Sequence, residues 1–185
     1  MTTASIPHAR ITPAEPPYTE SIATALDRIM PPGRPPLLLF RVLARDERLF
    51  QRLFAGGLLD RGNLTLRMRE LAILRTTANC KSEYEWGVHV AGFAERAGFT
   101  EVEVDDTLNA SPSATSWSDA ERILLRLMDE LHDRANISDA LWADAIQHFT
   151  EPQLLELIML AGYYHLIAFL TNGLRLPLEP WASRF

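Results

Sequence analysis

The stretch LRMRELAILRTTANCKSEYEWGVHVAGFAERAG, residues 66–98, is the most informative part of the sequence because it holds two helical patterns joined by a short link. In residues 64–78, apolar side chains recur at helical spacing among charged ones, which predicts an amphipathic helix with one strongly charged side. Residues 82–97 predict a second helix that ends at Gly98. The link of residues 79–81 is short, so we expect the two helices to pack antiparallel.

The sequence on both sides continues in helical patterns. Apolar residues recur at helical spacing in residues 19–30 and 46–55, and a further short element is expected after Thr100. Patterns typical of strands, with alternating β-branched or aromatic residues between turns, are missing. The prediction is therefore an all-α, single-domain helical bundle.

Local signals fix where several later helices begin. Ser118 with Glu121, and Thr150 with Gln153, each have the spacing of a capping box, and Ser138 is expected to be an N-cap. Residues 111–116 are rich in Ser, Pro and Thr and predict a loop.

The length and the N-terminal sequence suggest how the domain is organised. A chain of 185 residues has the size of one domain, and about 70% of its unfolded surface can be buried on folding. Residues 1–18 are rich in Pro and Thr without a helical period, so we expect an extended arm at 1–18 that wraps a neighbouring subunit, followed by a helical domain at 19–185.

Charge and hydropathy exclude several classes of partner. The formal net charge of −6 and the lack of a basic block argue against nucleic acid. The longest apolar stretch, residues 154–170, is interrupted by Glu156, Gly162 and His165, so we expect a buried helix and no membrane contact. The N-terminus lacks the pattern of a secretory signal, which leads us to expect a cytoplasmic protein.

A single cysteine limits the redox chemistry. Cys80 is the one cysteine of the sequence, so neither an intrachain disulfide nor a two-cysteine redox centre can form within one chain. Its place beside Lys81 near a helix start suggests a possible redox thiol, whereas a free cysteine is more often a small buried apolar residue.

The candidate catalytic residues are Glu70, Glu85 and His89. Glu85 and His89 are four residues apart and share a helix face, so the carboxylate can orient the imidazole and raise its pKa. Glu70 on the preceding helix can reach the same space. An oriented histidine is the usual general acid or base at neutral pH.

Each of these residues also has a purely structural interpretation. Ser82 and Glu85 have capping-box spacing, Glu85 and His89 suit a surface pair, and Glu70 among arginines suits a solvated face. A metal site built from Glu70, Glu85 and His89, with His165 as a fourth ligand, is a minor option because no His-x-x-x-His pair is present, so we predict no metal.

The strings RELAIL (69–74), YEWGVH (84–89) and AGF (91–93), with ELIMLAGYYHLIAFLTNGL (156–174) and LPLEP (176–180), resemble the carboxymuconolactone decarboxylase family. This family also contains the alkylhydroperoxidase D proteins. The resemblance runs over about residues 11–180 and is most specific in 67–98. It implies an all-helical bundle of the alkylhydroperoxidase D-like type that assembles into a homotrimer or homohexamer.

The resemblance separates two branches by their site residues. The peroxidase branch uses a glutamate, a Cys-x-x-Cys pair and a histidine four residues later, and alignment on Glu70 and His89 puts Ser82 and Glu85 in the two cysteine positions. Cys80 is two residues out of register, so the dithiol cycle cannot run as in that branch.

The decarboxylase branch keeps the glutamate and histidine without cysteine, cofactor or metal, and the sequence resembles this branch better. We therefore expect a cofactor-free carboxy-lyase acting on a small carboxylated or lactone-like molecule. His89 would donate a proton, Glu85 would orient it and Glu70 would position water or substrate. The expected substrate-binding residues are Arg67, Arg69, Tyr84 and Ser82.

Two other functions stay open at this point. One is a thiol-dependent peroxidase that uses Cys80 with an outside thiol. The other is a non-catalytic oligomeric binding protein, to which the acidic surface and the arm would be suited.

Overall fold

The computed structural model describes residues 9–109 and 116–185, and helices account for its regular secondary structure within these ranges. In chain order the helices are α1 (Glu20–Ile29), α2 (Leu38–Leu43), α3 (Glu47–Ala55), α4 (Leu66–Asn79), α5 (Glu83–Phe93), α6 (Glu101–Asp106), α7 (Asp119–Arg134), α8 (Asp139–Ala145) and α9 (Glu151–Gly173). The all-α prediction is therefore confirmed for the described residues. The predicted loop at 111–116 lies outside them except for Ser116.

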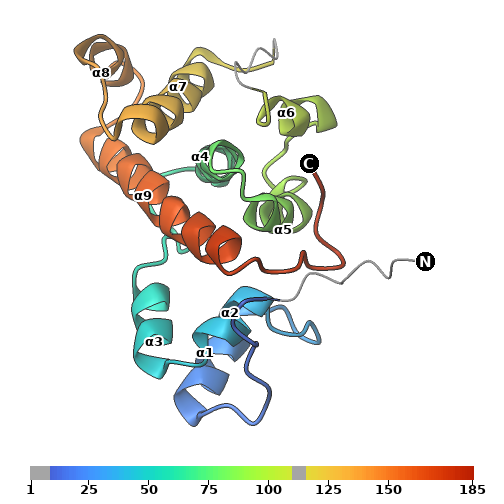
Figure 1. Cartoon of the computed structure of the whole chain (residues 1–185). Helices are drawn as coiled ribbons and strands as arrows, with labels where there is room; N and C mark the ends of the chain where they lie inside the picture. The colour runs from blue at the N-terminus through green and yellow to red at the C-terminus, as the bar shows by residue number, and fades with distance from the viewer. Residues whose placement is uncertain (1–8, 110–115) are drawn as a thin grey trace.

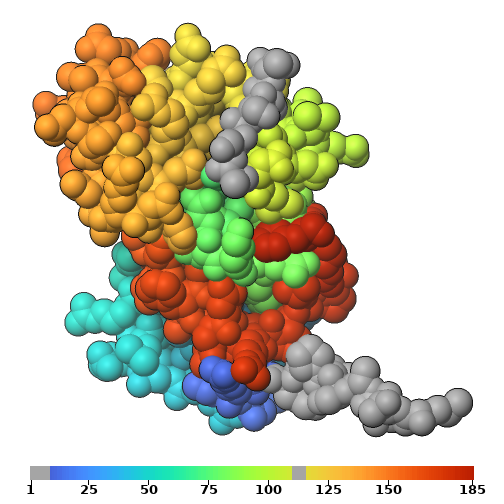
Figure 2. Space-filling view, turned by 45° about the horizontal axis from the view of Figure 1, so that its top comes forward, coloured from blue at the N-terminus to red at the C-terminus, as the bar shows by residue number. Residues whose placement is uncertain are grey.

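Helix α4 is the centre of the bundle. It packs against α5, α7 and α9, while α1, α2 and α3 form a group on the other side of α9 (Figure 1). In Figure 2 the green atoms of α4 and α5 lie between the yellow atoms of α7 and the red atoms of the C-terminal part of the chain. These two helices are thus enclosed by segments distant from them in sequence.

The burial of α4 corrects one prediction from the sequence. Every residue from Glu70 to Ala78 is buried, including Arg75, so this part of α4 does not present a charged side to solvent. The buried charges are tolerated because each has a partner, Arg69 and His89 for Glu70 and Asp129 for Arg75. A solvated role for Glu70 is therefore wrong.

The helix starts follow the capping signals with one exception. Capping boxes are present at Ser118 and Thr150, and the Ser138 side chain accepts a hydrogen bond from the backbone N–H of Leu141. The capping box expected at Ser82 is absent, because the Ser82 hydroxyl is buried and hydrogen-bonds to the Thr171 hydroxyl of α9 at 2.9 Å. Glu85 is thereby left free to turn toward His89.

The two ends of the chain lie against the bundle. The described part of the N-terminal arm is non-helical and contacts its own chain, with the Arg10 N–H donating to Leu174 O at 2.8 Å and the Ala14 N–H to Arg41 O at 2.9 Å. The C-terminal segment runs along α5, where the Ser183 N–H donates to Gly87 O at 3.1 Å. A Cβ at Gly87 would lie 2.1 Å from Ser183 O, so this close approach requires glycine.

Helix α9 is long and apolar enough to cross a membrane by length and composition alone, but half of its most apolar 18-residue window is buried inside the protein. Core helices of this kind pass the same test. Its outer face exposes a set of large apolar side chains, namely Leu155, Met159, Leu166 and Phe169.

Candidate active site

Glu70 and His89 form a buried pair between α4 and α5. The His89 Nδ1 lies 2.7 Å from Glu70 Oε2, and the side chains are only 3% and 1% exposed. This distance is that of a strong, charge-assisted hydrogen bond. The sequence predicts that Glu85 holds the imidazole, but the closer carboxylate belongs to Glu70.

The second ring nitrogen of His89 faces two further groups. Its Nε2 lies 3.4 Å from Glu85 Oε1 and 3.2 Å from the Tyr164 hydroxyl. The predicted contact between Glu85 and His89 is therefore present. Tyr164, contributed by α9, is not among the candidate site residues predicted from the sequence. A tyrosine inside an apolar helix needs a partner for its hydroxyl, and this requirement is the one signal that the sequence offers.

The surroundings of His89 favour its protonated form. Burial lowers its pKa, but the negative charges and hydrogen bonds of Glu70 and Glu85 outweigh burial and raise the pKa from 6.5 to about 9. At neutral pH the ring is therefore an imidazolium that can release a proton.

One carboxylate oxygen of the cluster has no protein partner. Glu85 Oε2 is buried and makes no hydrogen bond within the described residues. Burial of the hydroxyl, together with the charge of Glu85, also raises the pKa of Tyr163 to about 12 and the pKa of Tyr164 well above its usual value. Both phenols are thus neutral and able to donate a hydrogen bond. A buried, unpaired carboxylate oxygen is a position where a donor from water or a ligand would be stabilised.

Arg69 and Phe93 border the cluster on its more accessible side. The Arg69 Nε and Nη2 donate to Glu70 Oε1 at 3.1 and 3.0 Å, and its Nη1 donates to Leu59 O at 2.9 Å. Phe93 stacks on the His89 ring, with 5.3 Å between the ring centres. The Arg69 Nη1 also donates to Asp60 O at 3.4 Å, so one of the five N–H groups of the guanidinium is left beyond these bonds.

The other predicted substrate-binding residues lie elsewhere. Arg67 is held by Glu103 and Glu121 at 2.8 and 2.6 Å, and its guanidinium lies over Phe99. The Tyr84 hydroxyl donates to Glu179 of the C-terminal segment at 2.6 Å. Ser82 is hydrogen-bonded to Thr171, so among the described residues the hydrogen-bond and ion-pair partners of His89 are Glu70, Glu85 and Tyr164 and include none of these three.

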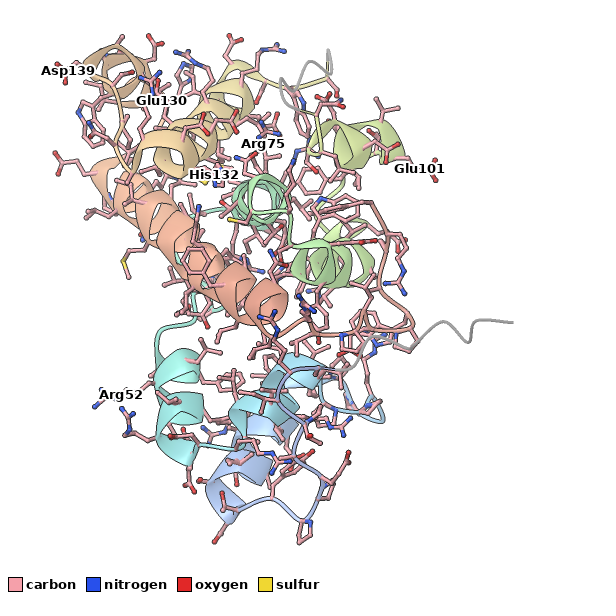
Figure 3. All side chains as sticks on the ribbon, viewed as in Figure 1. Arg52, Arg75, Glu101, Glu130, His132 and Asp139 are labelled. Atoms are coloured by element: carbon pink, nitrogen blue, oxygen red, sulfur yellow. The ribbon has the colours of Figure 1, made fainter. Side chains whose placement is uncertain are left out.

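Cys80 lies at the opposite end of α4 from Glu70. It is the C-cap of α4 and precedes Ser82, the N-cap of α5, by two residues, so the position near a helix start expected from the sequence is present as well. Its Sγ is 3.8 Å from His132 Nδ1, and burial raises the pKa of the thiol to about 11. Figure 3 shows His132 where α7, α9 and α4 come together.

Comparison with known proteins supports the resemblance drawn from the motifs. The model of the carboxymuconolactone decarboxylase family matches residues 47–130. No curated protein matches the sequence.

Solved structures share the fold over nearly the whole chain. An uncharacterized peroxidase-related protein from Ralstonia eutropha JMP134, described as an alkylhydroperoxidase AhpD core, is 16% identical with a TM-score of 0.82 and covers 96% of this chain and 95% of its own. A peroxidase-related protein from Silicibacter sp. TM1040 is 15% identical with a TM-score of 0.79, over 97% and 96% of the two chains. An AhpD-type protein of unknown function from Agrobacterium tumefaciens is 16% identical with a TM-score of 0.64, over 74% of this chain and 94% of its own.

The matched region contains Glu70, Glu85 and His89, and the fold similarity extends to α9, which contributes Tyr164. Residues 47–130 therefore resemble the carboxymuconolactone decarboxylase family, and the chain has an all-α fold like that of alkylhydroperoxidase AhpD.

Proposed function

We propose that this protein is a cofactor-free carboxy-lyase that removes carbon dioxide from a small carboxylated or lactone-like substrate. The observation that supports this most is the buried Glu70–His89 pair, in which the ring is protonated at neutral pH and lies beside the unpaired Glu85 Oε2. Such a pair supplies a proton where one is needed, and general acid catalysis of this kind contributes typically about 10²–10⁴-fold to a rate.

The proposed reaction needs one proton and one stabilised negative charge. When the bond between the substrate and its carboxylate breaks, its electron pair stays on the substrate and spreads into the unsaturated lactone. The imidazolium of His89 then gives its proton to carbon, so carbon dioxide and neutral His89 remain. Glu70 is a positioning residue that holds Nδ1 and favours the charged ring before transfer.

Substrate binding is assigned to Arg69 rather than Arg67. The Arg67 guanidinium is occupied by ion pairs with Glu103 and Glu121, whereas Arg69 borders the His89 cluster and has one N–H left for a ligand. Since His89 is only 3% exposed, a substrate reaches it only when a neighbour such as Phe93, which is half-buried, moves. The hydroxyl of Tyr164 is the proposed donor to the lactone oxygen.

The direct test is turnover of a panel of small γ-carboxy lactones, followed as carbon dioxide release. We expect His89→Gln to lower kcat by at least about 100-fold, within the range for loss of a general acid. His148→Gln, which changes an exposed histidine shortly after the end of α8, is the matched control and should keep the wild-type rate. Turnover by His89→Gln at the unmodified rate would refute the proposal.

A second candidate function is a thiol-dependent peroxidase that uses Cys80. It is favoured by the contact of Cys80 with His132 and by the peroxidase-related names of the similar structures. Against it, burial raises the pKa of Cys80 to about 11, which leaves little thiolate at neutral pH, and the sequence supplies no second cysteine. Hydroperoxide consumption that disappears in Cys80→Ser but persists in His89→Gln would favour this function.

A trimeric or hexameric assembly is part of the proposal. The exposed apolar face of α9, with Leu155, Met159 and Phe169, is of the kind that subunit contacts bury. Sedimentation of the wild-type protein tests it, and a monomer at micromolar concentration would contradict it.

A further inference from the structure

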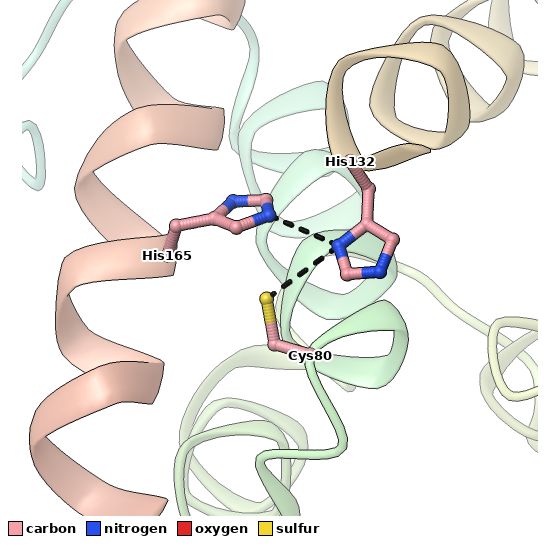
Figure 4. Close-up of side chains that lie close together, drawn as sticks. All are labelled: Cys80, His132 and His165. Atoms are coloured by element: carbon pink, nitrogen blue, oxygen red, sulfur yellow. Dashed lines mark hydrogen bonds between the residues drawn. The ribbon is translucent and has the colours of Figure 1, made fainter. Parts of the chain in front are cut away.

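Three metal-binding side chains converge at the outer end of α4. Cys80 at the end of α4, His132 on α7 and His165 on α9 place their Sγ and ring nitrogens within 4.8 Å of one another (Figure 4). His132 Nδ1 lies 3.0 Å from His165 Nε2 and 3.8 Å from Cys80 Sγ. His132 is exposed and the other two are half-buried, so the group is accessible from solvent.

A backbone hydrogen bond orients one lone pair, that of His165, toward the centre of the cluster. His165 Nδ1 lies 2.7 Å from Ala161 O, and a carbonyl can only accept, so Nδ1 carries the hydrogen. In neutral His165 this leaves Nε2 as a lone pair that points at His132. Metal-binding histidines typically have their second nitrogen fixed in this way by a backbone carbonyl.

The backbone also holds Cys80 in place. The Cys80 N–H donates to Thr76 O at 3.0 Å, and the Asn172 side chain of α9 donates to Cys80 O at 2.9 Å. Lys81 follows with a φ of 54°, which turns the chain sharply into α5. Asn172 thus ties the end of α4 to the same helix that contributes His165.

We propose that Cys80, His132 and His165 bind one divalent transition-metal ion, with Zn²⁺ as the expected ion and a fourth coordination position open to solvent. The spacing of the ligands matches that geometry. Tetrahedral zinc with bonds of about 2.0–2.1 Å to nitrogen and about 2.3 Å to sulfur places two nitrogens about 3.3 Å apart and nitrogen and sulfur about 3.6 Å apart. The observed 3.0 and 3.8 Å lie close to these values, and the Sγ of Cys80 lies within 4.8 Å of the His165 ring nitrogen.

Binding of the metal ion releases one proton. The Cys80 thiol releases its proton to solvent as the sulfur–metal bond forms. The hydrogen that His132 Nδ1 shares with His165 moves to the other nitrogen of the His132 ring, so both facing nitrogens offer lone pairs. A thiolate with two imidazoles selects zinc and similar ions over Mg²⁺ and Ca²⁺, which prefer oxygen ligands.

This site is separate from the His89 cluster. Glu70 and Cys80 are ten residues apart on α4, which corresponds to about 15 Å along the helix at 1.5 Å per residue. The minor metal option raised by the sequence, with Glu70, Glu85 and His89, is therefore a different site and can be tested independently. His165 belongs to the Cys80 cluster in the structure.

The experiment is titration of the metal-free full-length protein with Zn²⁺ and with Co²⁺. We expect one ion per chain by calorimetry, and for Co²⁺ the absorption bands of a tetrahedral ion together with thiolate-to-metal charge transfer. Loss of a direct ligand should weaken binding by more than the roughly 10–100-fold that loss of an outer hydrogen-bond partner costs. His132→Gln is the first variant to measure because His132 is exposed and its replacement leaves the core intact.

Cys80→Ser and His165→Gln complete the set, and Cys80→Ser should also abolish the charge-transfer band. His148→Gln and His89→Gln are the controls and should bind like the wild type. The proposal is overturned if no ion binds at micromolar concentration, if binding survives in all three ligand variants, or if it disappears in His89→Gln alone.

Discussion

The two histidine clusters at the ends of α4 differ in what surrounds the rings. His89 is buried among Glu70 and Glu85, and their charges raise its pKa to about 9. His132 lies near the surface, and burial followed by the charge of His165 lowers its pKa. The same side chain therefore offers a proton in one place and a lone pair in the other, and the neighbours alone decide which.

The two clusters should also contribute differently to the stability of the folded protein. The charges at the His89 end are buried and depend on one another, so removing one leaves the others buried with fewer partners. At the Cys80 end, an exposed ring can be replaced at little loss. Substitutions at the His89 end should therefore cost more stability than substitutions at the proposed metal site.

The largest effect is expected for Glu70→Ala. Removing Glu70 takes away the closer carboxylate of the buried His89 imidazolium and the ion-pair partner of Arg69, and should lower the free energy of unfolding by about 3–5 kcal/mol in urea denaturation. Glu95→Ala changes an exposed carboxylate of the same region and should stay within about 0.5 kcal/mol of wild type. Equal effects from the two variants would show that the pair does not support the fold.

The stability that His89 contributes should depend on pH. Because the pKa of His89 is raised to about 9 in the folded protein from 6.5, its stabilising contribution is fully present below 6.5 and is lost as the pH rises through 9. The shift from 6.5 to about 9 corresponds to at most about 3 kcal/mol at 1.36 kcal/mol per unit.

Urea unfolding of wild type and His89→Gln at about pH 6 and about pH 9.5 measures this contribution. The gap between the two proteins should shrink at the higher pH. A gap that stays constant or widens would mean that His89 is not charged in the folded state.

A smaller effect is expected at Gly87 in α5. The Cβ in Gly87→Ala would lie 2.1 Å from Ser183 O, so the C-terminal segment must shift, at about 1–3 kcal/mol of stability. Gly92→Ala meets nothing within 4 Å and should instead stabilise the helix, by about 0.5–1 kcal/mol. Thermal unfolding of the two variants side by side shows whether the close packing against α5 is confined to the side that carries Gly87.

The smallest effect is expected for His132→Gln without metal, where the free energy of unfolding should change by less than about 0.5 kcal/mol. Added Zn²⁺ should raise the unfolding temperature of the wild type, because a ligand of the folded state stabilises it by mass action, and should leave the variant unchanged. A large loss of stability in the metal-free variant would contradict the contrast between the two ends of α4.

The helices and most of their starts follow from the sequence. Apolar periodicity and the caps at Ser118, Ser138 and Thr150 act within one or two turns, so they are the same in the chain and in the fold. The placing of Glu85 beside His89 is of this local kind, because residues four apart share a helix face. The cysteine count, a property of the sequence alone, likewise excludes a two-cysteine redox centre within one chain.

Tertiary structure alone decided the rest. The choice of Glu70 as the closest partner of His89, the arrival of Tyr164 from α9 and the meeting of Cys80 with His132 join residues 19 to 75 positions apart in the chain. Arg67 forms ion pairs with Glu103 of α6 and Glu121 of α7 instead of joining the site. Periodicity records which face of a helix is apolar, but the partner on that face depends on how the helices pack, and the burial that shifts each pKa exists only after packing.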